Sequence, residues 1–230
     1  VGSNSPSNLA SKAIRFLLLD EVDKYPGAST KESDPISLAR ERTKTFQNRK
    51  IFITSTPTIT TGHVWKSLQG CDVEKHYFVP CPHCGKMIEL QWSQVKFPGG
   101  EGMSASSQAN LADRAEMAMY VCPECGAIIT DQHKPQMLRQ GEWRTVKENS
   151  PHHRNVGFWL NTLYSPFVRF SDVAREFLSS KDDPEKLQNF VNSWLAEPWE
   201  DTNLKTSAGL VLERQTHLPE LIVPAWAKLL

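Results

Sequence analysis

The sequence predicts a mixed α/β protein with a small metal-binding β insertion and helices near its C-terminus. Three observations support this fold class. Residues 16–19, Phe-Leu-Leu-Leu, are an unbroken apolar run that is typical of a strand buried on both faces of a parallel sheet. Two Cys-x-x-Cys-Gly motifs, which begin at Cys81 and Cys122, indicate a four-cysteine metal site. Apolar residues recur at helical spacing from Leu187 to Leu195, as in an amphipathic helix.

Acidic residues directly follow the first predicted strand. Asp20 and Glu21 are adjacent, and Asp23 is a third carboxylate. Ligands of open α/β sheets collect at the carboxyl ends of strands, and this pattern is the Walker B signature of P-loop ATPases. There the Asp holds Mg²⁺ and the Glu orients or deprotonates the attacking water. The alternative is a core strand that ends in a polar turn, because residues 24–27 read Lys-Tyr-Pro-Gly.

A helix and a second strand follow. Asp34 and Pro35 are typical of the N-cap and the first position of a helix, whose buried stripe would include Ile36 and Ala39. Residues 51–53, Ile-Phe-Ile, are a second short apolar strand. Strand, helix and strand at this spacing predict a βαβ unit.

Hydroxyl groups follow the second predicted strand, at Ser55 and Thr56. In a βαβ unit they would lie at the same sheet edge as Asp20 and Glu21, where they could sense a γ-phosphate or the attacking water. The alternative is a Ser/Thr turn closed by Pro57.

Four of the five cysteines form the two near-identical motifs, and the glycine after each motif permits the positive φ of a tight turn. The expected ligands are Cys81, Cys84, Cys122 and Cys125. Four thiolates in a tetrahedral array select Zn²⁺, and short strands at residues 77–79 and 119–121 complete the pattern of a zinc ribbon. His83 would crowd the first motif and is excluded as a ligand. Thiol redox chemistry is the rival, but a closed site leaves no low-pKa thiolate to react.

Further strands and helices are predicted after the second motif. Residues 141–144 and 156–163 would add strands after the ribbon. Ser171 is the expected N-cap of one helix, and Asp183 with Pro184 begins another.

The composition excludes some classes of partner and leaves others open. The formal net charge is zero, which gives no indication of a nucleic-acid or membrane partner. The longest apolar run is too short to cross a bilayer. Paired cysteines favour bound metal in a reducing compartment over disulfides. The stretch from Glu74 to Trp143 carries little excess positive charge, which favours a role in holding subunits or domains together over direct DNA binding.

Several longer stretches carry a resemblance to one family. They are Ser-Pro-Ser-Asn-Leu-Ala-Ser at 5–11, Leu-Leu-Leu-Asp-Glu-Val-Asp-Lys-Tyr-Pro at 17–26, Asn-Arg-Lys-Ile and Ser-Thr-Pro-Thr within 48–58, Val-Pro-Cys-Pro-His-Cys-Gly at 79–85, Leu-Tyr-Ser-Pro-Phe at 163–167, and Phe-Val-Asn-x-x-Leu-Ala-Glu-Pro-Trp-Glu at 190–200. In this order they resemble the large terminase subunit of lambda-like tailed phages, from about Gly2 to Trp199. That family is a DNA-packaging motor, an ATPase joined to a nuclease that cuts concatemeric genomes.

The resemblance implies roles for individual residues. Asp20 matches the family's Walker B metal-site Asp, and Glu21 matches its catalytic carboxylate. The segment Ser55, Thr56 and Pro57 resembles the one that couples hydrolysis to motion. The four paired cysteines match a zinc-ribbon-like insertion.

The same resemblance implies cofactors, partners and location. ATP, Mg²⁺ and structural Zn²⁺ are the expected cofactors. Double-stranded DNA, the small terminase subunit and the portal protein are the expected partners of a homo-oligomeric ring. We expect this motor to act in the host bacterial cytoplasm, and we expect no membrane among its partners.

The resemblance also divides the chain. We expect residues 1–72 to be the C-terminal half of the P-loop ATPase domain, 73–147 the zinc-ribbon-like insertion, 148–200 a strand and helices that complete or flank the ATPase domain, and 201–230 a linker. The sequence contains no Gly-x-x-x-x-Gly-Lys-Ser/Thr loop, so we expect the phosphate-binding loop upstream of Val1 and the nuclease domain after Leu230. These 230 residues alone would then be inactive.

Two rival functions remain open at this stage. One is a free-standing zinc-ribbon adaptor that binds nucleic acid or protein without catalysis. The other is a structural piece of a prophage-encoded motor whose active site no longer works. A neighbouring reading frame that encodes a P-loop and a nuclease would exclude the first. Whether the full-length protein hydrolyses ATP would decide the second.

Overall fold

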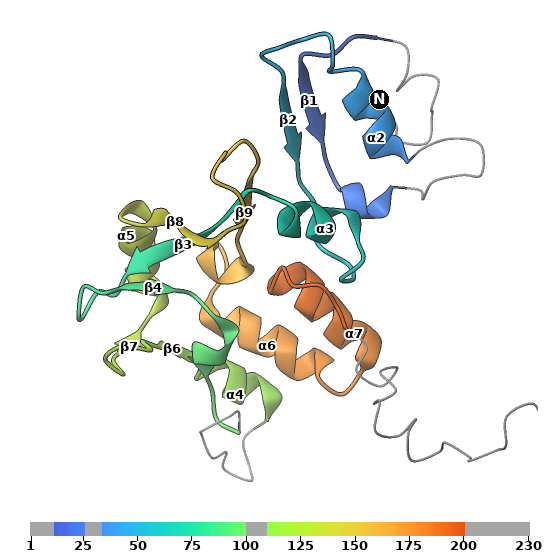
Figure 1. Cartoon of the computed structure of the whole chain (residues 1–230). Helices are drawn as coiled ribbons and strands as arrows, with labels where there is room; N and C mark the ends of the chain where they lie inside the picture. Colours follow the sequence, from blue (N-terminus) through green and yellow to red (C-terminus); the bar gives the residue numbers. More distant parts are fainter. Residues whose placement is uncertain (1–11, 26–33, 100–109, 201–230) are drawn as a thin grey trace, which may run out of the picture. The chain divides into compact units, whose positions relative to one another are not determined.

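The computed structural model of the protein describes residues 12–25, 34–99 and 110–200 (Figure 1). Its N-terminal part is a βαβ unit, as the sequence predicts. β1 (Phe16–Leu19) pairs in parallel with β2 (Lys50–Ile53), and α2 (Pro35–Glu41) lies between them in the chain. The parallel register places Leu19 opposite Ile53, so both strands end at the same edge.

The start of α2 agrees with the predicted cap. Asp34 Oδ1 accepts hydrogen bonds from the N–H groups of Ile36 at 3.0 Å and Ser37 at 3.1 Å, and Pro35 occupies the first helical turn. These bonds satisfy N–H groups that have no partner inside the helix. Ile36 and Ala39 are buried in one cluster with Leu17 of β1.

The prediction that the first strand is buried on both faces is wrong for the described residues. Leu17 and Leu19 are buried, whereas Phe16 is 60% exposed and Leu18 is 76% exposed. Phe52 of β2 is also exposed. The side chains of a strand alternate between two faces, and the described residues, α2 among them, bury only the face of Leu17 and Leu19.

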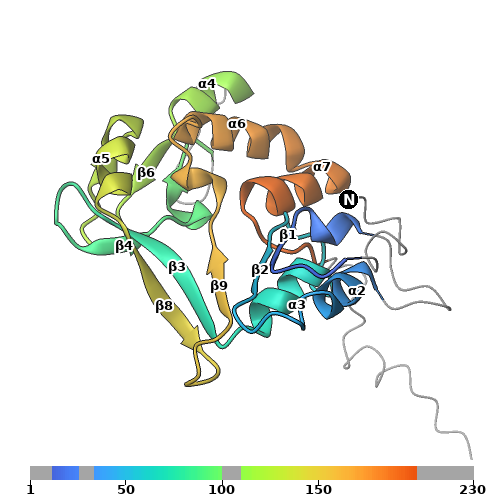
Figure 2. The same ribbon diagram turned by 90° about the horizontal axis from the view of Figure 1, so that it is seen from above.

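A second sheet is built around one long strand. β3 (Val73–Pro80) pairs antiparallel with β4 (Met87–Glu89) and β8 (Glu142–Glu148), and parallel with β9 (Val156–Trp159). α3 (His63–Gln69) precedes β3 in the chain. Figure 2 shows β8 and β9 on opposite sides of β3.

The predicted strand at residues 156–163 is shorter in the structure. β9 ends at Trp159, and a 3-10 turn follows at Thr162–Tyr164. Asn161 causes this turn, because its Oδ1 accepts the N–H of Leu163 at 3.0 Å while its Nδ2 donates to Leu90 O at 2.9 Å. The chain therefore leaves the sheet and enters the core, where Leu163 is fully buried.

A small antiparallel sheet carries the second cysteine motif. It contains β5 (Val95–Lys96), β6 (Met119–Val121) and β7 (Ile128–Ile129). α4 (Leu111–Glu116) lies between β5 and β6 in the chain, and α5 (Lys134–Arg139) follows β7. Each cysteine motif follows a strand, β3 or β6, as the sequence predicts.

Two helices close the described part of the chain. α6 (Phe170–Ser180) is followed by α7 (Pro184–Asn189), which continues into a π-helical turn at Phe190–Trp194. Asp183 caps α7 as predicted, since its Oδ1 accepts the N–H of Glu185 at 3.1 Å. Among the described residues, no helix is both long and apolar enough to span a bilayer.

The predicted N-cap of α6 is wrong by two residues. Arg169 is the N-cap, and Ser171 is buried inside the first turn. Asp172 explains the shift, because its Oδ2 accepts the N–H of Arg169 at 2.9 Å from the third helical position. A carboxylate at this position can cap the helix without a short polar residue at the N-cap itself.

Lys134 is a buried cation that fastens α5 to the segment before α6. Its side chain is 3% exposed, and its Nζ donates to Val168 O at 2.6 Å. Asp131 Oδ1 lies 3.2 Å from this Nζ, and the Phe170 ring centroid lies 4.1 Å away. Burial lowers the pKa of Lys134, and the nearby Asp131 carboxylate opposes the shift.

We expect Lys134→Met to lower the free energy of unfolding by about 2 kcal/mol, because the Val168 carbonyl and the Asp131 carboxylate lose their cationic donor. Lys134→Ala should cost more, since it also leaves a cavity. Urea unfolding measures both. Lys186→Met, the same change at a largely exposed site, should stay within about 0.5 kcal/mol of wild type. A Lys134→Met protein as stable as wild type would contradict this account.

Candidate active site and metal centre

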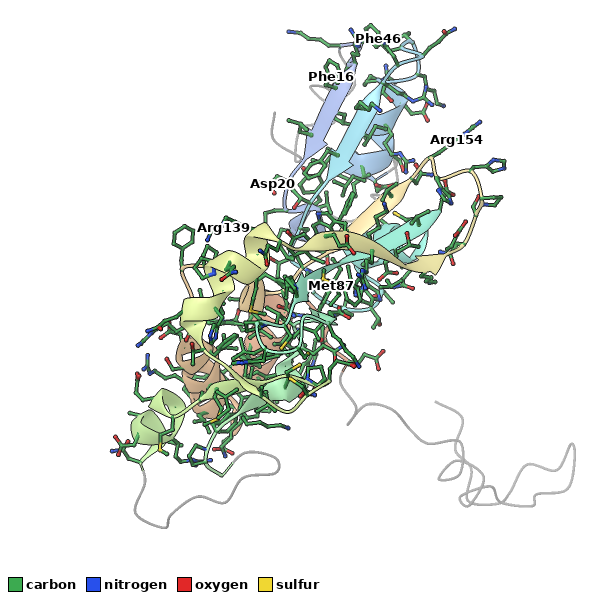
Figure 3. The ribbon with its side chains drawn as sticks, turned by 90° about the vertical axis from the view of Figure 1, so that its left-hand side faces the viewer. Phe16, Asp20, Phe46, Met87, Arg139 and Arg154 are labelled. Carbon is green, nitrogen blue, oxygen red and sulfur yellow. The ribbon has the colours of Figure 1, made fainter. Side chains whose placement is uncertain are left out.

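The turn after β1 presents the adjacent carboxylates. Asp20 is exposed, and its Oδ1 accepts the N–H of Glu21 at 3.0 Å. Figure 3 shows Asp20 at the opposite end of β1 from Phe16. Glu21 has φ 54° and ψ 44°, a left-handed conformation that few residues other than Gly adopt. Val22, which is fully buried, anchors the turn in the core.

The Glu21 side chain is partly accessible. It is 44% exposed, and its Oε2 lies 3.1 Å from Lys24 Nζ, without the geometry of a hydrogen bond. A surface ion pair of this kind contributes little to stability and breaks at low cost. Oε2 itself is buried and accepts no hydrogen bond within the described residues, so the exposed fraction of the side chain belongs to its other atoms.

The hydroxyl residues after β2 lie beside this turn, as the parallel register requires. Ser55 Oγ accepts the N–H of Asp23 at 3.2 Å and donates to Thr56 O at 3.0 Å. These bonds fix Ser55 to the carboxylate turn, so its hydroxyl has a structural role in this arrangement. The N–H of Thr54 donates to Leu19 O at 2.9 Å, which continues the parallel ladder to the ends of both strands.

A polar cleft of about 320 Å³ opens at this end of the two-stranded sheet of β1 and β2. One wall consists of Glu21 and residues 54–57. The other wall consists of residues 160–162, Asn192, Ser193 and Ala196. The structure thus brings Glu21, Ser55 and Thr56 together, while Asp20 lies on the adjoining turn and does not line the cleft. Carboxylate, hydroxyl and amide groups suit water, a divalent cation and phosphate oxygens.

The second wall of the cleft was not found by sequence reasoning. Asn161 and Asn192 are polar residues with low exposure in the C-terminal part of the chain, and no catalytic or metal-binding motif includes either of them. Asn192 lies in the stretch 190–200 that resembles the terminase family, but that resemblance assigned it no role.

The four motif cysteines form a single cluster. Their Sγ atoms all lie within 4.8 Å of one another, and Cys81 Sγ is 3.9 Å from Cys125 Sγ. Four sulfurs around one zinc, each at about 2.3 Å, would stand about 3.8 Å apart. The donor set and its spacing therefore fit one tetrahedral zinc ion. His83 is not part of the cluster, and its Nε2 lies 2.8 Å from Ile128 O.

Two glycines shape the turns of this cluster. Gly85 has φ 71° and Gly126 has φ 72°, and a Cβ at either position would meet no atom within 4 Å. The glycines are therefore needed for their backbone conformation and not for space. Each N–H donates at 2.9 Å to the carbonyl of the first cysteine of its motif, Cys81 or Cys122.

The protonation of the thiols depends on their surroundings. Burial raises the pKa of Cys81 to about 12, although hydrogen bonds from the N–H groups of Cys84 and His83 act to lower it. Burial also acts to raise the pKa of Cys122, but the N–H groups of Cys125 and Glu124 outweigh it and lower the pKa. Cys71, outside the cluster, is a half-buried thiol, and burial raises its pKa.

The part of the chain that carries the Asp20–Glu21 turn and the cysteine cluster matches a known protein family. Residues 1–143 match the family model described as "Phage terminase large subunit gpA, ATPase domain". The chain belongs to the phage terminase large subunit family. Both cysteine motifs and the Asp20–Glu21 turn of this terminase chain lie inside the ATPase match.

A second family model covers the rest of the terminase chain. Residues 155–230 match the "Terminase large subunit gpA, endonuclease domain". This match begins at residue 155, whereas we expected the nuclease domain after Leu230. The cleft walls therefore fall in two matches, Glu21 and residues 54–57 in the ATPase match and residues 160–196 in the endonuclease match.

Individual relatives agree with the family assignment. The terminase large subunit of Enterobacteria phage P21 is 25% identical over 228 residues, which cover 87% of this chain and 33% of that protein. The terminase large subunit of Escherichia phage lambda is 22% identical over 233 residues, 94% of this chain and 35% of that protein. The chain thus spans about a third of the length of these relatives. No solved structure matches it.

Proposed function

We propose that this chain is part of an ATP-driven motor that packages phage DNA into the procapsid and, in the full-length protein, cuts concatemeric DNA. The observation that carries the proposal is the match of residues 1–143 to the terminase ATPase domain, with adjacent carboxylates at the carboxyl end of a parallel strand. The polar cleft beside Glu21 supports it. The match of residues 155–230 to the endonuclease domain supports the cutting activity.

The residue roles in this proposal follow from position and chemistry. Asp20, exposed at the end of β1, would hold Mg²⁺, which neutralises phosphate charge when ATP is bound. Glu21 would orient the attacking water and accept its proton. Thr56 lines the cleft and would contact the water or the γ-phosphate, while Ser55 holds the carboxylate turn in place.

A structural zinc ion completes the proposal for the insertion at residues 73–147. Cys81, Cys84, Cys122 and Cys125 would bind it as thiolates, and the spacing of the four sulfurs supports this role. With all four thiols occupied, redox chemistry at these positions is disfavoured. We further propose that the insertion joins domains or subunits, because its charge is balanced.

The proposed partners come from the family and not from a contact in the structure. They are double-stranded DNA, the small terminase subunit, the portal protein and further copies of the chain in a ring. The proposed place of action is the host bacterial cytoplasm. ATP hydrolysis and DNA packaging by the full-length protein test the proposal, and a full-length protein that bound zinc but hydrolysed no ATP would favour a zinc-ribbon adaptor.

Asp20→Asn in the full-length protein should weaken binding of Mg²⁺–ATP by at least about tenfold, because an amide is a poorer ligand for Mg²⁺ than a carboxylate. Binding of ATP without Mg²⁺ should change much less. Fluorescence titration with an ATP analogue, with and without Mg²⁺, measures the difference. Asp72→Asn, which changes an Asp whose Oδ2 accepts the N–H groups of Arg154 and Asn155, controls for general loss of charge. Equal loss of affinity with and without Mg²⁺ would argue against Asp20 as the metal ligand.

A further inference from the structure

Asp23, the third carboxylate of the turn, is fixed by three hydrogen bonds. Its Oδ2 accepts the N–H of Thr58 at 2.8 Å and the Thr58 hydroxyl at 3.0 Å. Its Oδ1 accepts the N–H of Val64 at 2.7 Å. Hydrogen bonds to a charged acceptor are short and strong, so Asp23 has little freedom to move. The turn that carries Glu21 is thereby attached to residue 58.

Space for this carboxylate depends on one glycine. A Cβ at Gly62 would lie 2.4 Å from Asp23 Oδ2, closer than two such atoms can approach. Gly62 has φ −63°, so its backbone conformation is open to other residues. The glycine is required here for close approach of the carboxylate and not for conformational freedom.

Thr58 also forms hydrogen bonds with residues at the C-terminal end of the described chain. Its carbonyl accepts Asn192 Nδ2 at 2.8 Å and the N–H of Trp199 at 2.9 Å. Asn192 Nδ2 also donates to Glu197 O at 2.8 Å. Thr58 therefore binds Asp23 through its N–H and hydroxyl, and binds residues 192–199 through its C=O.

Asn192 occupies an unusual part of its helix. It is buried and lies in the π-helical turn Phe190–Trp194, a type of turn that is frequent at functional sites. It lines the same cleft as Glu21. The series Asp23, Thr58 and Asn192 thus begins two residues from Glu21 and ends at another residue of that cleft.

We propose that Asp23, Thr58 and Asn192 are positioning residues that hold the Glu21 turn in its working geometry and couple it to residues 190–199. This inference rests on the proposed ATPase function. Glu21 has a left-handed backbone, a conformation that persists only where surrounding contacts enforce it. The series supplies such contacts. It also connects residues of the ATPase match with residues of the endonuclease match, so a shift of residues 190–199 changes the position of the catalytic carboxylate.

Steady-state ATP hydrolysis by the full-length protein tests this coupling. Thr58→Val removes the hydroxyl with little change in volume, and Thr58 does not line the cleft. Asn192→Ala removes the amide. Each variant should lower kcat by about tenfold or more with the KM for ATP nearly unchanged, because small misplacement of a catalytic group is costly. Thr58→Ser, which keeps the hydroxyl, should restore most of the kcat.

Matched controls separate positioning from simple loss of structure. Asn189→Ala removes another amide, one whose Oδ1 accepts from Ser193 Oγ at 3.1 Å outside the series, and should keep the wild-type kcat. Thermal unfolding of every variant gives the folded fraction at the assay temperature. Losses of kcat that follow the unfolded fraction, or an equal loss in Asn189→Ala, would overturn the inference.

A Glu21→Gln variant distinguishes the two levels of the proposal. Inactive Glu21→Gln together with wild-type kcat in Thr58→Val and Asn192→Ala would overturn the coupling and leave the ATPase assignment standing. Normal turnover in Glu21→Gln would overturn the assignment of the active site, and with it the coupling. Loss of kcat in all three variants, with rescue by Thr58→Ser, is the expected result.

Discussion

Replacing Glu21 by Gln is expected to abolish ATP hydrolysis by the full-length protein while leaving ATP binding intact. Gln keeps the length and shape of the side chain but accepts no proton from the attacking water. Loss of a general base typically costs about 10²–10⁴-fold in rate. Gln tolerates the left-handed backbone at this position no worse than Glu, so the turn should keep its conformation. Steady-state hydrolysis and equilibrium binding of ATP measure the two effects separately.

The control for this variant is the same substitution elsewhere in the βαβ unit. Glu41→Gln changes an exposed residue of α2 that forms a surface ion pair with Lys44. Its turnover should equal that of wild type, since such pairs contribute little. If Glu21→Gln and Glu41→Gln hydrolysed ATP equally well, Glu21 would not be the catalytic base.

Local patterns made much of the fold and site predictable. An apolar run followed by Asp20 and Glu21 predicted the strand and its acidic end, because burial and the strand terminus are encoded in adjacent residues. The caps at Asp34 and Asp183 were predictable for the same reason, since each acts on N–H groups two and three residues away. The cysteine cluster followed from repetition of one motif.

Features that depend on distant residues could not be read from the sequence. The contact between Thr58 and Asn192 joins residues 134 positions apart, and neither residue belongs to a motif that predicts the other. The exposed face of Phe16 and Leu18 has a related cause. A run of apolar residues shows that a strand can be buried on two faces, but it does not show which elements cover them. The N-cap at Arg169 was missed because Asp172 supplies the capping carboxylate from inside the helix.

Removal of zinc is expected to unfold the insertion locally while the βαβ unit stays folded. The cysteine turns are held by few bonds of their own, such as Cys81 N–H to Lys86 O at 2.8 Å and Cys122 N–H to Ala127 O at 3.0 Å. In small zinc-finger peptides the metal contributes about 10–16 kcal/mol to folding. Metal analysis should find one zinc per chain, and a chelator or Cys81→Ser should remove it.

Two measurements report the local nature of this unfolding. Amide hydrogen exchange should increase at β5, β6 and β7 and remain slow at β1 and β2, because Leu17 and Leu19 belong to a separate buried cluster. Titration with a thiol reagent should detect the motif cysteines only after zinc is removed. Cys71 lies outside the cluster, so the Cys71→Ser protein should bind zinc and show the same hydrogen-exchange pattern as wild type. A native protein without zinc, with all motif thiols reactive and the small sheet still protected, would show that the cluster does not need a metal.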